Sequence, residues 1–331
     1  MQLSKIGEFG LIKKLRTKCK NTRNEILAGI GDDAAAIKQG NKKILITTDM
    51  LLEGIHFDLS FTTFYQLGYK FLGVNISDIF AMGGNPKYFF ISLGIPKDYK
   101  SNDIDELYSG ILKIAKKFGI AIAGGDTCAS RQGFVLGGTL VGDADIVITR
   151  SGARVGNNIF VTSTLGDSAM GLMFLKRQKA ERRRQKLKFK TQNSKLKTLN
   201  SKDVSYLIKK HLMPEPIPLK NTSKVTSMID ISDGLLIDLS HICDESKVGA
   251  VIYKDKIPIS GELTDTAKIL GTDPVKFALK GGEDYALLFT APPDVKTTAT
   301  KIGEIITRER FIIDEKGRKI KFKPEGYEHF K

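Results

Sequence analysis

The sequence contains no tryptophan, only three cysteines and no long apolar run among its 331 residues. Cys19, Cys128 and Cys243 are far apart and form no CxxC pattern, which argues against a disulfide framework or a structural zinc site and fits a reducing compartment. No apolar run reaches about 18 residues, and the N-terminus lacks the apolar segment of a signal peptide. We therefore expect a cytoplasmic protein without a membrane span.

Positive charge is in excess, with 52 Lys and Arg residues against 37 Asp and Glu and a net charge of +15. Residues 176–202 hold 12 of the basic residues and one acidic residue, Glu181, so this segment carries +11 of the excess. The rest of the chain is close to neutral, so nucleic acid is not the expected partner. We interpret the segment as a solvated arm or loop; contact with RNA or an anionic surface is the alternative, although Phe189 alone is too little for base stacking.

Apolar runs alternate with helix-like stretches, which is typical of α/β proteins, and the length suffices for two domains. Apolar spacing predicts helices over 65–82, 103–119, 203–212, 235–243 and 274–280. Strands are predicted over 87–95, 120–126, 227–232, 249–254 and 285–291, with a strand–turn–strand unit over 133–148. The turn-rich GARVGN places a boundary near residue 150, which gives domains 1–150 and 151–331, the second with the basic insertion 176–202.

Aspartates recur beside apolar elements, at strand ends, after glycine turns and once inside an apolar helix. They are Asp32, Asp33, Asp49, Asp78, Asp126, Asp230 and Asp233. An ionised carboxylate in apolar surroundings is costly unless it is paired or binds a metal, so the set indicates a shared cation site. Each aspartate alone also fits a helix cap or a turn. Oxygen ligands favour Mg²⁺ or Mn²⁺ over zinc, and Thr47 and Thr48, just before Asp49 at the end of the strand ILI, would add further oxygens.

Glycines accompany these aspartates at Gly29, Gly31, Gly124, Gly125, Gly234, Gly281 and Gly282. Glycine lets backbone N–H groups approach an anion closely, so the combination with a hard cation indicates phosphate chemistry, although tight turns alone explain any one of them. The chain has no GxxxxGK[ST] loop and no kinase HRD or DFG motif. His56 is the one candidate acid or base in the N-terminal half, and a lone histidine beside apolar residues also fits a structural role.

From Gly7 to Phe330 the chain carries, in order, the motifs GEFGLI, GIGDDAA, TTDMLLEGIHF, NISDIFAMGGNP, AGGDT, TRSGARVG, DISDGL, GGEDY and GYEHF. This ordered set resembles the thiamine-monophosphate kinase family. That family belongs to a superfamily with aminoimidazole ribonucleotide synthetase, selenophosphate synthetase and a hydrogenase-maturation protein. The resemblance implies their two-domain α/β (α+β) ATP-binding fold. It also implies a homodimer in which the N-terminal sheet pairs with its copy, and an active site between the domains.

The resemblance also assigns roles to residues. It implies a cluster of Mg²⁺ ions held by Asp33, Thr47, Thr48, Asp49, Asp78, Asp126, Asp230 and Asp233. Contacts to ATP are implied for Gly125, Asp126, Arg150, Ser232 and Tyr108. Contacts to thiamine monophosphate are implied for His56, Glu283 and Tyr327. The basic segment is longer than expected for the family but lies away from every motif.

The implied reaction is the last step of thiamine diphosphate biosynthesis, in which ATP phosphorylates thiamine monophosphate. The acceptor is a phosphate monoester with a second pKa of about 6, so it is already a nucleophile at neutral pH and needs no general base. We expect direct in-line transfer without a phosphoenzyme, with Mg²⁺ offsetting the repulsion between the two anions. Arg150 suits a phosphate contact, Glu283 suits the cationic thiamine, and Tyr327 offers either an aromatic face or simple packing.

Other functions are less well supported. GGEDY and GYEHF argue against aminoimidazole ribonucleotide synthetase. The lack of a cysteine in the N-terminal catalytic position argues against selenophosphate synthetase, and the lack of one at the C-terminus argues against the hydrogenase-maturation protein. An RNA-binding protein on the same scaffold is the alternative from another class, and the intact aspartate set argues against it.

Overall fold

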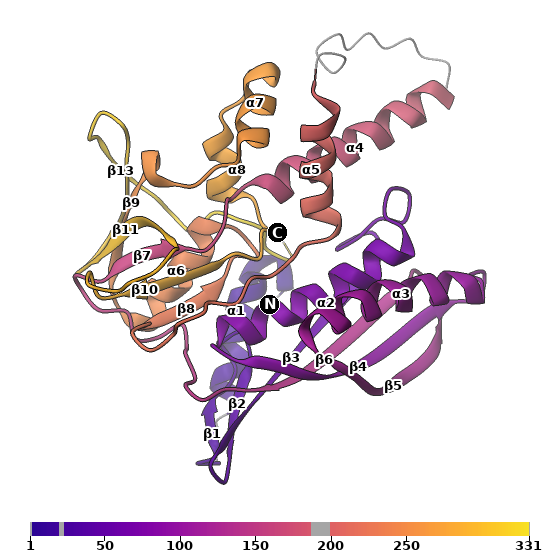
Figure 1. Cartoon of the computed structure of the whole chain (residues 1–331), viewed down its shortest axis with the longest axis horizontal. Coiled ribbons are helices and arrows are strands. Elements are labelled where there is room, and N and C mark those ends of the chain that lie inside the picture. Colours follow the sequence, from indigo (N-terminus) through magenta and orange to yellow (C-terminus); the bar gives the residue numbers. More distant parts are fainter. Residues whose placement is uncertain (1, 20–22, 187–198, 331) are drawn as a thin grey trace.

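The computed structural model describes residues 2–19, 23–186 and 199–330, which form two sheets flanked by helices (Figure 1). The N-terminal sheet has the order β1-β2-β3-β6-β4-β5. Its strands are β1 (Ile26–Ala28), β2 (Ala35–Gln39), β3 (Lys42–Leu52), β4 (Asn85–Pro96), β5 (Ala121–Ser130) and β6 (Val135–Asp143). Neighbouring strands are antiparallel except β4 and β5, which are parallel and joined through a helix.

The helices of this half are α1 (Leu3–Lys18), α2 (Phe64–Ala81) and α3 (Ser101–Phe118). Both α2 and α3 lie on one face of the sheet, and the other face carries no helix in the described part of the chain (Figure 1). A capping box formed by Thr63 and Gln66 starts α2. Helix α2 is buried almost all round, because it packs against the N-terminal sheet on one side and against the C-terminal half on the other.

The C-terminal sheet has the order β13-β12-β9-β11-β7-β10-β8, and only β9 and β12 are parallel. Its strands are β7 (Asn158–Val161), β8 (Ser227–Asp230), β9 (Gly249–Tyr253), β10 (Leu287–Ala291), β11 (Thr300–Ile306), β12 (Arg310–Ile313) and β13 (Lys319–Lys321). The helices are α4 (Asp167–Lys186), α5 (Ser201–Leu212), α6 (Leu235–Ser246), α7 (Gly261–Leu270) and α8 (Pro274–Lys280), with a 3₁₀ turn η2 (Lys254–Lys256).

One apolar core runs across the junction of the two halves. Met228 of β8 and Leu287 and Phe289 of β10 belong to the same buried cluster as Phe71 and Ile79 of α2. A second core fills the space between the C-terminal sheet and α6. Helix α2 of the N-terminal half packs against β8 of the C-terminal half in the first core. A polar side chain at the margin of this contact therefore lies close to both halves of the chain.

The predicted helices are confirmed, with ends that differ by at most three residues. Most predicted strands differ from the structure by one or two residues at their ends, and three predictions differ more. Strand β3 continues past Asp49 to Leu52, because it pairs with β6 over its whole length. Strand β5 continues past the glycines and Asp126 to Ser130, because β4 pairs with it up to Pro96. Residues 144–148 form no second strand, because the ladders on both sides of β6 end at Asp143.

The basic segment begins as the second half of α4, where Lys176, Arg177 and Lys179 are exposed. The helical arm expected there is therefore present up to Lys186, and residues 187–198, with Phe189, lie outside the described residues. Among the described helices, none combines the length and the apolar character that a membrane crossing requires.

Candidate active site

Three aspartates from distant parts of the chain meet beside α2. Asp33 comes from the turn before β2, Asp78 from α2 and Asp230 from the end of β8. One carboxylate oxygen of each lies within 4.8 Å of the others. The packing of α2 against β8 thus brings a side chain of the C-terminal half to two of the N-terminal half.

Neighbouring side chains hold these carboxylates in place. The Thr47 hydroxyl donates a hydrogen bond to Asp78, and it also lies 3.2 Å from the main-chain oxygen of Asp33. Ser77 Oγ donates to Asp230 Oδ2 over 2.6 Å. Asp33 is almost fully buried, and while its Oδ1 accepts from Arg150 Nη2 over 2.6 Å, its Oδ2 has no hydrogen-bond partner among the described residues.

The cluster is short of positive charge. Burial raises the pKa of Asp49 to about 6 and that of Asp230 to about 8, and the negative charge of Asp33 adds to both shifts. Burial and the charges of Asp49 and Asp230 raise the pKa of Asp78 well above its ordinary value. Arg150 is the cation paired with the cluster. A divalent cation would relieve the remaining repulsion, so these donors fit a hard metal ion.

An open pocket of about 620 Å³ adjoins the cluster. Asp49, Asp78 and Asp230 form part of its wall. The other predicted site residues in the wall are His56, Ser232, Asp233, Glu283 and Tyr327. The pocket lies between the two halves of the chain and contains all three residues assigned to thiamine monophosphate.

Glu283 is held by two basic side chains that the sequence analysis missed. Lys70 Nζ of α2 lies 2.7 Å from Glu283 Oε1, and His211 Nδ1 of α5 lies 3.1 Å from Oε2. Burial opposes ionisation of Glu283, but Lys70 and His211 outweigh it and hold the pKa of this carboxyl well below its usual range. A lysine among the apolar residues of the predicted helix 65–82 was the one signal available in the sequence.

Aromatic side chains line the wall near His56. Its Nδ1 accepts a hydrogen bond from the Leu52 N–H over 3.0 Å, and its ring centroid lies 5.1 Å from that of His329. The His329 ring in turn lies 4.9 Å from the Tyr327 ring. Burial lowers the pKa of His56, and the His329 charge acts in the same direction. His329, in the motif GYEHF, is a further pocket residue that the sequence analysis did not assign.

Comparison with known proteins supports this organisation. Residues 31–144 match the family model "AIR synthase related protein, N-terminal domain", and residues 154–313 match "AIR synthase related protein, C-terminal domain". The thiamine-monophosphate kinase of Aquifex aeolicus is 34% identical over 336 residues, which cover 100% of both chains. That of Buchnera aphidicola subsp. Acyrthosiphon pisum is 37% identical over 348 residues, covering 98% of this chain and 99% of the relative.

The chain belongs to the thiamine-monophosphate kinase family.

A solved structure extends the likeness to three dimensions. The structure of AaThiL complexed with AMPPCP and TMP superposes on this chain with a TM-score of 0.83 at 32% identity, over 99% of each chain. The thiamine-monophosphate kinase fold therefore covers both halves and the pocket between them.

Four residues assigned from the kinase family lie outside both the pocket wall and the adjoining carboxylate cluster. Thr48 is exposed on the opposite face of β3 from Thr47, where its hydroxyl meets that of Thr139 at 3.3 Å. Gly125 and Asp126 lie on the exposed edge strand β5. A Cβ on Gly125 would lie 1.8 Å from the Ile91 oxygen, so the close approach of β4 excludes any side chain there. Tyr108 lies on α3, packed against the N-terminal core.

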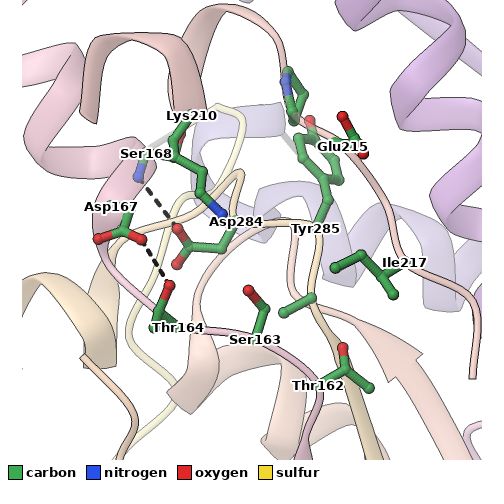
Figure 2. A pocket seen from close by; sticks show the side chains of 12 residues that line it. Thr162, Ser163, Thr164, Asp167, Ser168, Lys210, Glu215, Ile217, Asp284 and Tyr285 are labelled. Carbon is green, nitrogen blue, oxygen red and sulfur yellow. Dashed lines mark hydrogen bonds between the residues drawn. The ribbon is translucent and has the colours of Figure 1, made fainter. Parts of the chain in front are cut away.

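A second, much smaller pocket lies at the start of α4 (Figure 2). Asp284 accepts hydrogen bonds from the Gly166 N–H at 2.6 Å and the Ser168 N–H at 3.2 Å, and burial raises its pKa to about 7. Thr164 Oγ1 donates to Asp167 Oδ2 over 2.7 Å. At about 10 Å³ the space is too small for a substrate. These contacts join the GGEDY turn to the first turn of α4, beside Glu283.

Proposed function

We propose that this protein transfers the terminal phosphate of ATP to thiamine monophosphate, giving ADP and thiamine diphosphate. The observation that carries the proposal is a single pocket that combines the carboxylate cluster with His56, Glu283 and Tyr327. The full-length relatives named thiamine-monophosphate kinase support it, and so does the structural relative that binds AMPPCP and TMP.

Mg²⁺ is the proposed metal. Asp33, Thr47, Asp49, Asp78 and Asp230 would hold it. Their fit rests on Asp33 Oδ2, which has no hydrogen-bond partner among the described residues, on the convergence of three carboxylates, and on the raised pKa values of Asp78 and Asp230. When bound, Mg²⁺ supplies positive charge that stabilises the transferring phosphoryl group. Thr48, Asp126 and Asp233 stay in the proposed ligand set; Thr48 would act through its main-chain oxygen, because its side chain faces away.

The protein side chains bind and orient the two substrates. Arg150, which is fixed by Asp33 and is 21% exposed, is proposed to contact ATP phosphate together with Ser232. His56 keeps a neutral ring beside the pocket, and Glu283 offers an ionised carboxylate to the thiamine cation. No general base is required, because the acceptor phosphate is already ionised at neutral pH.

We also propose a homodimer built on the face of the N-terminal sheet that α2 and α3 leave open. Met50, Tyr88 and Phe90 are 59%, 50% and 40% exposed on this face. Strand β5 is exposed along almost its whole length at the sheet edge, so its backbone is free to pair with another strand. A second copy would cover both features and place Gly125 and Asp126 at the interface.

The division at residue 150 remains our proposed domain boundary. The last strand of the first sheet ends at Asp143 and the first strand of the second begins at Asn158, which supports it. For the basic segment we propose a solvated arm rather than a nucleic-acid site, because Lys179 is already paired with Asp58.

A coupled assay of ADP release tests the proposed activity. Turnover with thiamine monophosphate that requires Mg²⁺ and is lost in Asp49→Asn is the expected result. Asp145→Asn, which changes an exposed aspartate away from the pocket, serves as the matched control. Nucleotide binding without turnover of thiamine monophosphate, in protein that is folded and supplied with Mg²⁺, would contradict the substrate assignment.

A further inference from the structure

Lys70 is a buried lysine in the apolar helix α2. Its side chain is 3% exposed, and Tyr69, Phe71 and Leu72 beside it are buried too. A charge at such a depth is costly unless it is paired, and a lysine is rarely placed there for packing alone. Its ion-pair partner is Glu283, a residue of the other half of the chain.

Each oxygen of the Glu283 carboxylate has a different basic partner. Lys70 reaches Oε1 from α2, and His211 reaches Oε2 from the last turn of α5. His211 Nδ1 also lies 3.1 Å from Ser168 Oγ at the start of α4, so three elements fix this one carboxylate. The Glu283 backbone adopts φ = 63°, a conformation that non-glycine residues seldom take without a fixed environment.

Glu283 is nevertheless open to the pocket, because its side chain is 27% exposed. An ionised carboxylate accepts about four hydrogen bonds, so the two basic partners leave capacity for a ligand. The Lys70 charge largely cancels that of Glu283. The Glu283 carboxylate therefore recognises a ligand mainly through the orientation of the hydrogen bonds that it can still accept. That arrangement suits a ligand that presents an amino group on an aromatic ring.

Resting on the proposed function, we propose that Lys70 and His211 are positioning residues for thiamine monophosphate. They do not touch the substrate; they hold the Glu283 carboxylate in the orientation that accepts hydrogen bonds from the amino-bearing ring of thiamine. Without either of them, the Glu283 carboxylate is no longer held in this orientation. Binding of thiamine monophosphate then weakens, while ATP binding is retained.

Steady-state kinetics with both substrates varied tests the inference. In Lys70→Met and in His211→Leu, the KM for thiamine monophosphate is expected to rise by about tenfold to a hundredfold, since the substrate loses its well-oriented hydrogen bond to the Glu283 carboxylate. The KM for ATP is expected to stay within about twofold. His211→Asn places an amide donor near the lost Nδ1 and is expected to recover most of the affinity. Lys117→Met, which removes a lysine from the exposed pair with Glu215, is the control.

Calorimetric titration with thiamine monophosphate alone and thermal melting complete the test. Equal increases in both KM values, with no recovery in His211→Asn, would show a merely structural link between the halves and overturn the inference. An unchanged KM for thiamine monophosphate would overturn it as well. If Lys70→Met does not fold, the two His211 variants decide the matter. A wild-type protein that neither binds nor phosphorylates thiamine monophosphate would instead refute the proposed function itself.

Discussion

Thr47 and Thr48 are adjacent in the sequence but lie on opposite faces of β3. The Thr47 hydroxyl is buried and donates to Asp78 in the carboxylate cluster. The Thr48 hydroxyl is exposed and meets Thr139 on the open face of the sheet. Because side chains alternate along a strand, only one hydroxyl of this pair belongs to the pocket side.

The two threonines provide a matched pair of variants. Thr47→Val removes the hydrogen bond that orients Asp78 and is expected to lower kcat/KM by about tenfold or more, with a higher Mg²⁺ requirement. Thr48→Val keeps the main-chain oxygen and is expected to stay within about threefold of wild type. Kinetics at several Mg²⁺ concentrations measures both. A larger loss in Thr48→Val than in Thr47→Val would show that the Thr48 hydroxyl is itself a ligand.

The carboxylate cluster is expected to contribute less to the stability of the metal-free protein as the pH rises from about 5 to 8. The folded-state pKa of Asp49 is about 6 and that of Asp230 about 8, both above the ordinary value of 3.8. The folded protein therefore binds more protons than the unfolded chain in this range, and the stability that these carboxyls contribute below about pH 4 is lost as they ionise. Added Mg²⁺ favours the ionised form and should raise Tm more at pH 8 than at pH 5.

Thermal melts in EDTA and in Mg²⁺ at the two pH values check this. Asp230→Asn removes one of the carboxyls whose pKa is raised, so it is expected to weaken the pH dependence of Tm in EDTA. Asp145→Asn at the surface should leave that pH dependence unchanged. The same pH dependence of Tm in EDTA for wild type and Asp230→Asn would contradict the expectation.

The sequence predicted the helices well, because helices depend on local patterns. Periodicity alone places Asp78 on a helix, and the motif DISDGL marks Asp230. The extent of β3 and β5 was not predictable, since it depends on how far β6 and β4 pair with them. The contact of Lys70 with Glu283 could not be predicted from the sequence either, because it forms only when α2 packs against the C-terminal half.

The proposed dimer predicts that Phe90→Lys yields a monomer. Phe90 is 40% exposed on the open sheet face, and a lysine there would be buried without a partner in the dimer. Val155→Lys, at a residue 58% exposed in the turn between the sheets, is the control that should keep the wild-type mass. Sedimentation equilibrium distinguishes the two states. The same mass for wild type and Phe90→Lys would exclude this face as the interface.

Asp284→Ala is expected to lower the free energy of unfolding by about 1–3 kcal/mol. It leaves the Gly166 and Ser168 N–H groups at the start of α4 without their acceptor, and buried donors without partners carry that cost. Asp284→Asn keeps one acceptor oxygen and should lose less. Asp294→Ala, which breaks an exposed pair with Lys224, should leave the free energy of unfolding almost unchanged. Urea unfolding at pH 7 measures all three, and equal stability of the Ala and Asn variants would show that Asp284 does not act as the helix cap.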